Sequence, residues 1–366
     1  MIPCNELIRA YNLYPDEYDA AALRVLKSGW YILGKEVEAF EKEFAASLSD
    51  DCYCAGTDNG LNAIRIGLHA YGIGPGDEVI MQSNGYIATT LGITQNGATP
   101  VFVEPDKYHN IDADKIEAAI TDKTKAVLVT HLYGMCTNQM EKIQKICKEH
   151  GLGLFEDCCE SHYATWNGIQ TGLFGDAGFF SFYPTKNLGG YGDGGGVVSK
   201  NKDFIDKIKT LRNYGSDYQY HNIMLGFNSR LDEMQAALLR VKLTHMEEYM
   251  ANRRHVAERY LAEIKNPLVK LPEVIPGGKH VWYLFVTNVD DQAGFREYLK
   301  ENGVGSAIHF PVPPHLEPCM SYLNLPEGSF PIAEHDCKTV VSLPMMDVMG
   351  DDEIDKVIEV VNSYGK

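Results

Sequence analysis

The stretch FSFYPTKNLGGYGDGGG, residues 180–196, places one lysine, Lys186, between a strand-like segment and six glycines. A lone lysine is usually a solvated surface charge. A dinucleotide-binding glycine motif would open a helix, whereas the strand-like GVVSK follows here. Glycine has no Cβ atom, so it allows sharp turns and close approach. The glycines at 189, 190, 192 and 194–196 are therefore expected to make room for a ligand beside Lys186.

From about residue 50 to 200, on both sides of Lys186, short β-branched runs alternate with helix-like segments and predict a mostly parallel, doubly wound sheet. The expected strands lie in DEVIMQS, TPVFVE, KAVLVTHLYG, LGLFEDC and GGVVSK. Helical periodicity over residues 230–266 indicates a long connector. Beyond it, HVWYLFVTNV predicts a strand, and QAGFREYLKENG and DDEIDKVIEVVNSYG predict helices. We expect a large domain over residues 1–245 and a smaller α+β domain over residues 246–366.

The composition limits the possible partners. The 366 residues include 33 Lys and Arg and 50 Asp and Glu, a net charge of −17 that repels nucleic acid and anionic membranes. No segment has the pattern of a membrane span or a secretory signal. The nine cysteines contain no C-x-x-C pair, which favours reduced thiols and no metal site. We expect a cytoplasmic protein that binds neither nucleic acid nor membrane.

Two polar residues follow apolar runs, where ligands bind in α/β sheets. Asp157 follows LGLFE, and Lys186 follows the run that contains FSF, so both side chains are expected in one cleft. Alone, the carboxylate of Asp157 would equally be a helix cap. Together, the two groups match pyridoxal phosphate (PLP): the amine binds the aldehyde as a Schiff base, and the carboxylate keeps the pyridine nitrogen protonated.

The phosphate of PLP needs local donors in so acidic a chain. Thr57, Asp58 and Asn59 precede a helix-like segment, and this turn offers backbone amides to a phosphate or merely caps the helix. Ser181 adds a hydroxyl. Tyr86, at a strand end, is expected either to stack on the pyridine ring or to pack in the core.

Seven segments, in order along nearly the whole chain, resemble the DegT-type nucleotide-sugar aminotransferases, which are PLP enzymes of fold type I. They are SGWYILGKEVEAFE, GPGDEVI, VTHLYG, FEDCCESH, GDAGFFSFYPTKNLGGYGDGGGVV, GFNSRLDEMQAALL and IHFPVPPH. The resemblance implies that Lys186 is the Schiff-base lysine, Asp157 the partner of the pyridine nitrogen and Tyr86 the stacking ring, with Ser181 and residues 57–59 at the phosphate. It also implies a homodimer with shared sites, in which Asn228 of one subunit reaches the PLP phosphate of the other.

Glu160 departs from the family pattern, which commonly has a glutamine that donates to the phenolic oxygen of PLP. A carboxylate cannot donate unless it is protonated, and it repels a phenolate unless its pKa rises or it turns away. We therefore expect Glu160 to affect the protonation of the resting cofactor rather than the lysine chemistry.

The resemblance implies transfer of an amino group from L-glutamate to the C3 ketone of a dTDP-3-keto-6-deoxyhexose, for deoxyamino-sugar biosynthesis. GFNSRLDEMQAALLRVKL, NGLNAI and FSFYPTKNLG are more similar to members that aminate C3 than to the alternative, C4 aminotransferases. Tyr183 and His309 are candidates for sugar-nucleotide contacts or for ordinary packing. A sugar dehydratase of this fold would have histidine in place of Lys186. A non-catalytic binding or regulatory protein would lose Lys186 or Asp157.

Overall fold

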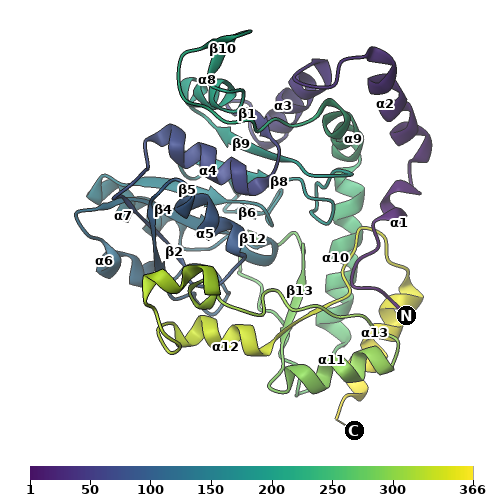
Figure 1. Cartoon of the computed structure of the whole chain (residues 1–366). Coiled ribbons are helices and arrows are strands. Elements are labelled where there is room, and N and C mark those ends of the chain that lie inside the picture. The colour runs from purple at the N-terminus through teal and green to yellow at the C-terminus, as the bar shows by residue number, and fades with distance from the viewer. Residues whose placement is uncertain (366) are drawn as a thin grey trace.

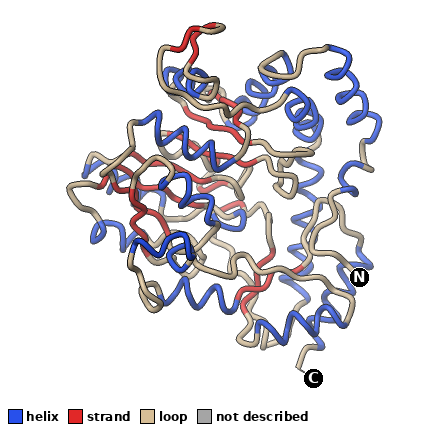
Figure 2. Tube along the Cα trace, in the orientation of Figure 1, coloured by secondary structure: helices blue, strands red, loops and turns tan. Residues whose placement is uncertain are grey.

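A seven-stranded sheet forms the centre of the structure, a computed structural model that describes residues 1–365 (Figures 1 and 2). The strands, in spatial order, are β1 (Tyr53–Thr57), β9 (Gly195–Ser199), β8 (Ala177–Ser181), β5 (Gly153–Asp157), β4 (Thr124–Thr130), β2 (Glu78–Gln82) and β3 (Thr99–Val103). Neighbouring strands are parallel except that β9 runs antiparallel to both β1 and β8. The predicted mostly parallel sheet is confirmed.

Helices cover both faces of this sheet, because the strand residues alternate between two cores. Met81 and Leu128 belong to one core, whereas Ile80 and Val127 belong to the other. The first face is covered by α4 (Gly60–Tyr71), α5 (Ile87–Thr94) and α8 (Lys202–Leu211). The second face is covered by α3 (Lys35–Leu48), α6 (Ile116–Ala119), α7 (Met140–His150) and α9 (Glu233–Thr244). Burial on both faces explains why the strands are nearly continuous apolar runs.

Helix α4 shows how local sequence sets an element. Its N-cap Asn59 accepts a hydrogen bond from the amide of Asn62 at 2.8 Å. It ends at Gly72, whose φ of 105° is a left-handed conformation that favours glycine. The cap fixes the start of α4 directly after β1, so the helix N-terminus opens at the edge of the sheet.

The C-terminal part of the chain has its own core, which joins residues from Val256 to Val361. Its elements are α10 (Met246–Glu263), β13 (Phe285–Asn288), α11 (Gln292–Glu301), α12 (Pro331–Thr339), β14 (Val340–Leu343) and α13 (Asp351–Ser363). β13 and β14 pair antiparallel. The N-terminal segment contacts this part, since Ile2 pairs with Val304 and Arg9 forms an ion pair with Glu353 at 2.5 Å. The domain division at residues 245 and 246 stays a prediction.

Two sequence-based expectations were wrong in detail. The long connector over residues 230–266 contains two helices, α9 and α10, separated by His245, whose ψ of 11° breaks the helical path. The strand expected over residues 280–289 begins only at Phe285. Trp282 has a φ of 49°, which no extended strand allows.

The remaining elements are short except for α2. The helices are α1 (Ile8–Tyr11), α2 (Pro15–Ser28) and the 3₁₀ helices Ala113–Lys115, Leu132–Gly134, Pro314–Leu316 and Pro318–Leu323. The strands are β6 (Thr165–Trp166), β7 (Ile169–Gln170) and β12 (Gly278–Lys279) in one small sheet, and β10 (Ser216–Tyr218) and β11 (His221–Asn222) in a hairpin that projects from the body (Figure 1). Among the described residues, no helix combines the length and apolar character that crossing a bilayer requires.

The glycines that follow Lys186 are crowded, but by the protein itself. A Cβ atom on Gly195 would lie 2.3 Å from the backbone carbonyl of Asn59, and one on Gly189 would lie 2.4 Å from the carbonyl oxygen of Pro184. The φ angles at positions 189–196 are not positive. These glycines therefore allow loop, strand and helix start to pack closely, and the room for a ligand beside Lys186 stays a prediction.

Gly195→Ala should destabilise the protein by about 1–3 kcal/mol or more, because β9 and the start of α4 would have to separate. The midpoint of urea unfolding measures this effect. Gly74→Ala is the matched control, since the nearest atom to its added Cβ would be 3.9 Å away. Equal midpoints for the two variants would contradict the close packing of Gly195 against Asn59.

Candidate active site

A cavity of about 650 Å³ lies at the carboxyl ends of β4, β5 and β8. The last residues of these strands, Thr130, Asp157 and Ser181, all line it. Parallel strands end at one edge of a sheet, so the fold gathers side chains that are far apart in sequence. The cavity also contains Asn59, Tyr86, Glu160, Tyr183, Lys186 and His309. The structure thus brings most of the sequence-predicted residues together.

Lys186 is the cation of this cavity, and its side chain is 12% exposed. Its Nζ atom lies 3.4 Å from Oε1 of Glu160 and 4.1 Å from the centroid of the Tyr283 ring. Burial alone would lower the pKa of the ammonium, but Tyr283 and Glu160 raise it above the usual lysine value. The prediction that Lys186 is no ordinary surface lysine is consistent with this environment.

Asp157 is buried at the end of β5. One carboxylate oxygen accepts a hydrogen bond from the Thr89 hydroxyl at 2.6 Å, and the other accepts one from the Cys159 amide at 3.1 Å. No helix of the described chain begins directly after Asp157, so the helix-cap alternative does not apply. The two donors fix the carboxylate at the wall of the cavity. Thr89 lies in the first turn of α5, and no sequence motif predicted its contact with Asp157.

Glu160 turns one carboxylate oxygen toward Lys186 and the other toward the protein backbone. Its Oε2 accepts a hydrogen bond from the Tyr133 amide at 2.9 Å. Tyr133 has a φ of 61°, an unfavourable conformation for an aromatic residue, which directs its N–H toward Glu160. The Tyr133 hydroxyl donates to the carbonyl of His309. Tyr133 therefore holds two walls of the cavity together.

The start of α4 borders the cavity, as an anion site requires. The residues that line the cavity lie one or two positions further along the chain than the predicted residues 57–59. Asn59, Gly60 and Leu61 line the cavity, whereas Thr57 and Asp58 do not. Thr57 donates to the Asn59 carbonyl, and Asp58 accepts from Ser229 and Asn62. The first amides of a helix have no acceptor within it and attract anions. The expected roles of Thr57 and Asp58 in this turn are therefore supporting ones.

The aromatic and imidazole side chains lie around the cavity. Tyr86 and Tyr183 are 56% and 52% exposed, so they stand at its mouth rather than in the core. Nδ1 of His309 lies 2.8 Å from the Ser342 hydroxyl oxygen. Burial, with a contribution from Lys186, lowers the pKa of His309 to about 4, so this ring is neutral at pH 7. Asn228 is exposed and does not line the cavity.

Glu156, the neighbour of Asp157, has a structural role. It accepts hydrogen bonds from three backbone amides, those of Gly172, Phe174 and Gly175, and it lies 2.9 Å from Nε2 of His131. The carboxylate of Glu156 is not part of the candidate active site, since Glu156 does not line the cavity.

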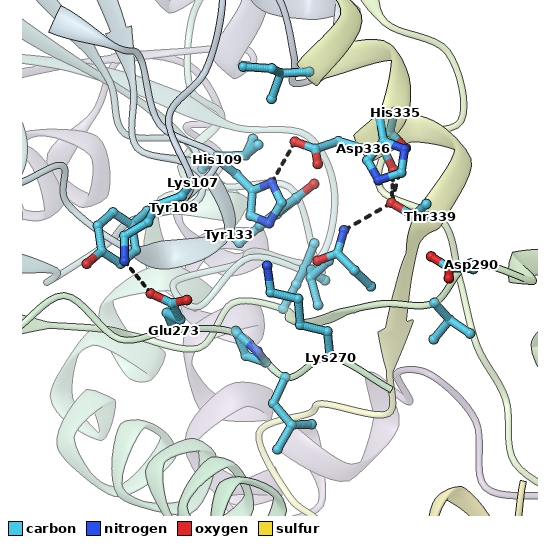
Figure 3. Close-up of a pocket in the computed structure, with 18 of the residues that line it drawn as sticks. Lys107, Tyr108, His109, Tyr133, Lys270, Glu273, Asp290, His335, Asp336 and Thr339 are labelled. Atoms are coloured by element: carbon cyan, nitrogen blue, oxygen red, sulfur yellow. Dashed lines mark hydrogen bonds and ion pairs between the residues drawn. The ribbon is translucent and has the colours of Figure 1, made fainter. Parts of the chain in front are cut away.

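A second cavity, of about 550 Å³, is lined in part by Tyr133 (Figure 3). His109 and Asp336 face each other there at 2.8 Å, and Lys107 pairs with Glu273 at 2.6 Å. The ring centroids of Tyr133 and His109 are 5.5 Å apart. Leu132, the neighbour of Tyr133, lines both this cavity and the candidate active site.

Comparison with known proteins gives consistent matches over the whole chain. The model of the DegT/DnrJ/EryC1/StrS aminotransferase family matches residues 14–362. The dTDP-3-amino-3,6-dideoxy-alpha-D-galactopyranose transaminase of Aneurinibacillus thermoaerophilus is 47% identical over 366 residues, which is 100% of both chains. Two solved structures are also similar. DesV of S. venezuelae in complex with a ketimine intermediate has a TM-score of 0.96 and 40% identity, over 99% of this chain and 98% of that one. NtdA of Bacillus subtilis with bound cofactor PMP has a TM-score of 0.87 and 30% identity, over 94% and 80%.

Glu160→Gln should lower the pKa of Lys186, because it removes a negative charge that stabilises the ammonium. The rate at which an amine-specific reagent modifies Lys186 in the ligand-free protein, measured against pH by peptide mass spectrometry, should rise at lower pH than in the wild type. Glu273→Gln, which removes the partner of the distant Lys107, is the control. A Lys186 profile that is identical in the wild type and in Glu160→Gln would show that Glu160 does not act on this amine.

Proposed function

Because the chain belongs to the DegT/DnrJ/EryC1/StrS aminotransferase family, we propose that it transfers an amino group from L-glutamate to the C3 ketone of a dTDP-linked 3-keto-6-deoxyhexose. The chain is a PLP-dependent aminotransferase of fold type I. The observation that carries the choice of substrate is the match, over its full length, to a relative named for a sugar with its amino group at C3. The reaction would supply deoxyamino-sugar biosynthesis.

The donors around the cavity fit PLP. Lys186 offers an amine for the aldehyde, Asp157 a fixed carboxylate for the pyridine nitrogen, and the start of α4 amides for the phosphate. A Cβ atom on Gly60 would lie 2.8 Å from Cβ of Ser181, so only glycine fits at this position. The amides at the start of α4 and the Ser181 hydroxyl can therefore bind the same anion. The volume of about 650 Å³ is suitable for a cofactor and part of a substrate.

Lys186 and Asp157 have different parts in the proposed reaction. PLP, when bound, supplies a carbon that accepts the amino group and a ring that withdraws electrons. Lys186 anchors the cofactor, and once the donor displaces it, its Nζ carries the proton away from Cα of the donor. Asp157, fixed by Thr89 and Cys159, keeps the ring nitrogen protonated. In the second half, the same groups act in reverse order on the sugar ketone.

The residues at the mouth of the cavity would orient the substrate. Tyr86 would cover the ring face, and Tyr183 and the neutral His309 would contact the sugar nucleotide. Glu160 would control the charge near the phenolic oxygen from its position beside Lys186.

A second copy of this chain would complete the site. The cavity carries three carboxylates, those of Asp157, Glu160 and Asp193, against the single cation Lys186, and no arginine of residues 1–365 lines it. Substrates with carboxylate or phosphate groups therefore need cations from elsewhere. The β10–β11 hairpin and the segment after it expose Tyr220 and Leu225 by 91% and 92%. Such exposed apolar side chains indicate a contact surface. We place Asn228, which follows this hairpin, at the phosphate of the other subunit.

We also place the enzyme in the cytoplasm. All nine cysteines are free, which is consistent with a reducing compartment.

The proposed reaction predicts that purified protein with a panel of dTDP-keto sugars and L-glutamate forms a new C–N bond at C3, located by NMR. Lys186→Ala should abolish turnover, because it removes both the anchor and the proton carrier. Amination at C4 would overturn the C3 assignment in favour of the C4 alternative. Turnover by Lys186→Ala would contradict the role of the lysine.

The shared-site arrangement predicts that two inactive variants complement each other. Asn228→Asp places a carboxylate against the phosphate and should nearly abolish activity. After subunit exchange with Lys186→Ala, half of the dimers are mixed, and each has one site with both defects and one intact site. About a quarter of wild-type activity per total site should return.

Native mass spectrometry of the mixture must first establish that the subunits have exchanged. Activity no higher than the average of the two parents, in a mixture that contains mixed dimers, would mean that each site is built from a single chain.

A further inference from the structure

Three buried charged side chains form a cluster next to the backbone of Lys186 and do not line the cavity. Lys242 of α9 and Arg253 of α10 both bind Asp347, in the loop between β14 and α13. The Lys242 Nζ–Asp347 Oδ2 and Arg253 Nε–Asp347 Oδ1 distances are both 2.7 Å. The three side chains are 5%, 1% and 11% exposed. We call them the buried ion triad.

The buried ion triad contains one carboxylate for two cations. Burial alone would raise the pKa of Asp347, but Lys242 and Arg253 lower it, so the carboxylate stays charged. A buried cation is costly unless other acceptors surround it. The acceptors here are backbone carbonyls. Arg253 Nη1 donates to the carbonyls of Trp282 and Tyr283 at 2.9 and 3.1 Å, and Lys242 Nζ lies 3.5 Å from the carbonyl of Lys186.

These carbonyls belong to two segments, the one that contains Lys186 and the one that contains Trp282 and Tyr283. The two segments meet at the amine of Lys186. Lys186 carries the amine, and Tyr283 places its ring 4.1 Å from Nζ. Asn187 joins the same two segments, since its side-chain amide donates to the Val281 carbonyl at 2.8 Å. The positive φ of Trp282 turns this backbone so that its carbonyls reach Arg253. The separation between the Tyr283 ring and the amine thus depends on where Arg253 holds residues 282 and 283.

The buried ion triad does not reach the substrate side. Its members do not line the candidate active site. Lys242 and Asp347 instead border a separate cavity of about 170 Å³, with Gly189 and Gly190. Any effect of these residues on the reaction must therefore pass through the backbone that they bind.

We propose that Arg253, oriented by Asp347, is a positioning residue for transamination: it fixes the backbone of residues 282–283 and so holds the Tyr283 ring against the amine of Lys186. This inference rests on the proposed role of Lys186. Nε of Arg253 donates to one carboxylate oxygen of Asp347 while Nη1 donates to two backbone carbonyls. This arrangement uses separate N–H groups of the planar guanidinium, which no lysine reproduces.

Arg253→Met is the sharpest variant, because it leaves Lys242 and Asp347 as a balanced pair with no unpaired buried charge. We expect kcat to fall by about tenfold or more, since a small misplacement of the reacting group slows the chemical step. KM for both substrates should change less than about threefold, because the substrate side is untouched. A wild-type kcat in Arg253→Met would overturn the proposal.

A spectroscopic readout separates positioning from general damage to the fold. In the holoenzyme, the pH dependence of the cofactor's visible absorbance reports the proton at the Lys186 nitrogen. Release of the Tyr283 ring removes a group that favours the protonated form, so the midpoint should move to lower pH in Arg253→Met. The same shift is expected for Tyr283→Leu. The double variant should shift no further than either single one, because both changes remove one interaction. Additive shifts would overturn the proposal.

Arg212→Met is the matched control. Arg212 and Glu41 are both 6% exposed and form an ion pair that the half-exposed Lys209 joins, and Arg212 also donates to the Gly56 carbonyl at 2.6 Å. This variant also leaves a balanced pair, so it should lower stability comparably without moving the absorbance midpoint. An equal shift in Arg212→Met would mean that the effect is general destabilisation and would overturn the proposal.

Two outcomes keep this test apart from that of the proposed function. If Arg253→Met does not fold, Arg253→Lys takes its place, because it retains the ion pair with Asp347 but not the carbonyl contacts. An absorbance midpoint in Arg253→Lys equal to that of the wild type would overturn the proposal. The absorbance titration needs no sugar substrate. It therefore remains valid if every dTDP-keto sugar fails to react, an outcome that would overturn the proposed function alone.

Discussion

The arrangement of polar residues around the cavity depends on the buried ammonium group of Lys186. Lys186 is almost completely enclosed, yet Glu160 and Tyr283 keep its pKa above the usual value. Each of these two groups requires support of its own. Glu160 is held by the strained backbone of Tyr133, and Tyr283 lies on a segment that Arg253 binds. Much of the polar interior around the large sheet is arranged around this one charge.

The histidines near the Lys186 ammonium are neutral, so they add no positive charge to its surroundings. Burial, with contributions from Lys186, lowers the pKa of His162 to about 3 and that of His309 to about 4, so neither histidine is charged at neutral pH. The start of α4 offers partial positive charge without a full cation. In the proposed site, one lysine, a hydroxyl and backbone amides would hold an anionic cofactor in a chain with a net charge of −17.

Sequence analysis predicted the sheet and the position of Lys186 and Asp157 at one cavity because both follow local rules. Apolar runs predict strands, and polar residues at strand ends predict the edge where they meet. The antiparallel direction of β9 and the late start of β13 depend on tertiary packing, so no local pattern reveals them. The same is true of Thr89, Tyr283 and Arg253, whose importance comes from contacts over long sequence distances. The predicted turn, residues 57–59, lies one or two residues before the residues that line the cavity, Asn59, Gly60 and Leu61. The difference arises because the N-cap residue, Asn59, determines where α4 begins.

The antiparallel strand β9 has a consequence for biosynthesis. β1 is at the edge of the sheet, and β9 is its only partner there; Tyr53 pairs with Ser199, 146 positions later (199 − 53). At roughly 5–20 residues per second, a ribosome needs roughly 7–30 s to make the chain between them. During that interval β1 has both edges unpaired, which invites association with other nascent chains. The start of α4, which the Asn59 carbonyl fixes against Gly195, waits equally long. The close packing of β9 against the start of α4 is therefore completed only after more than half of the polypeptide has been translated.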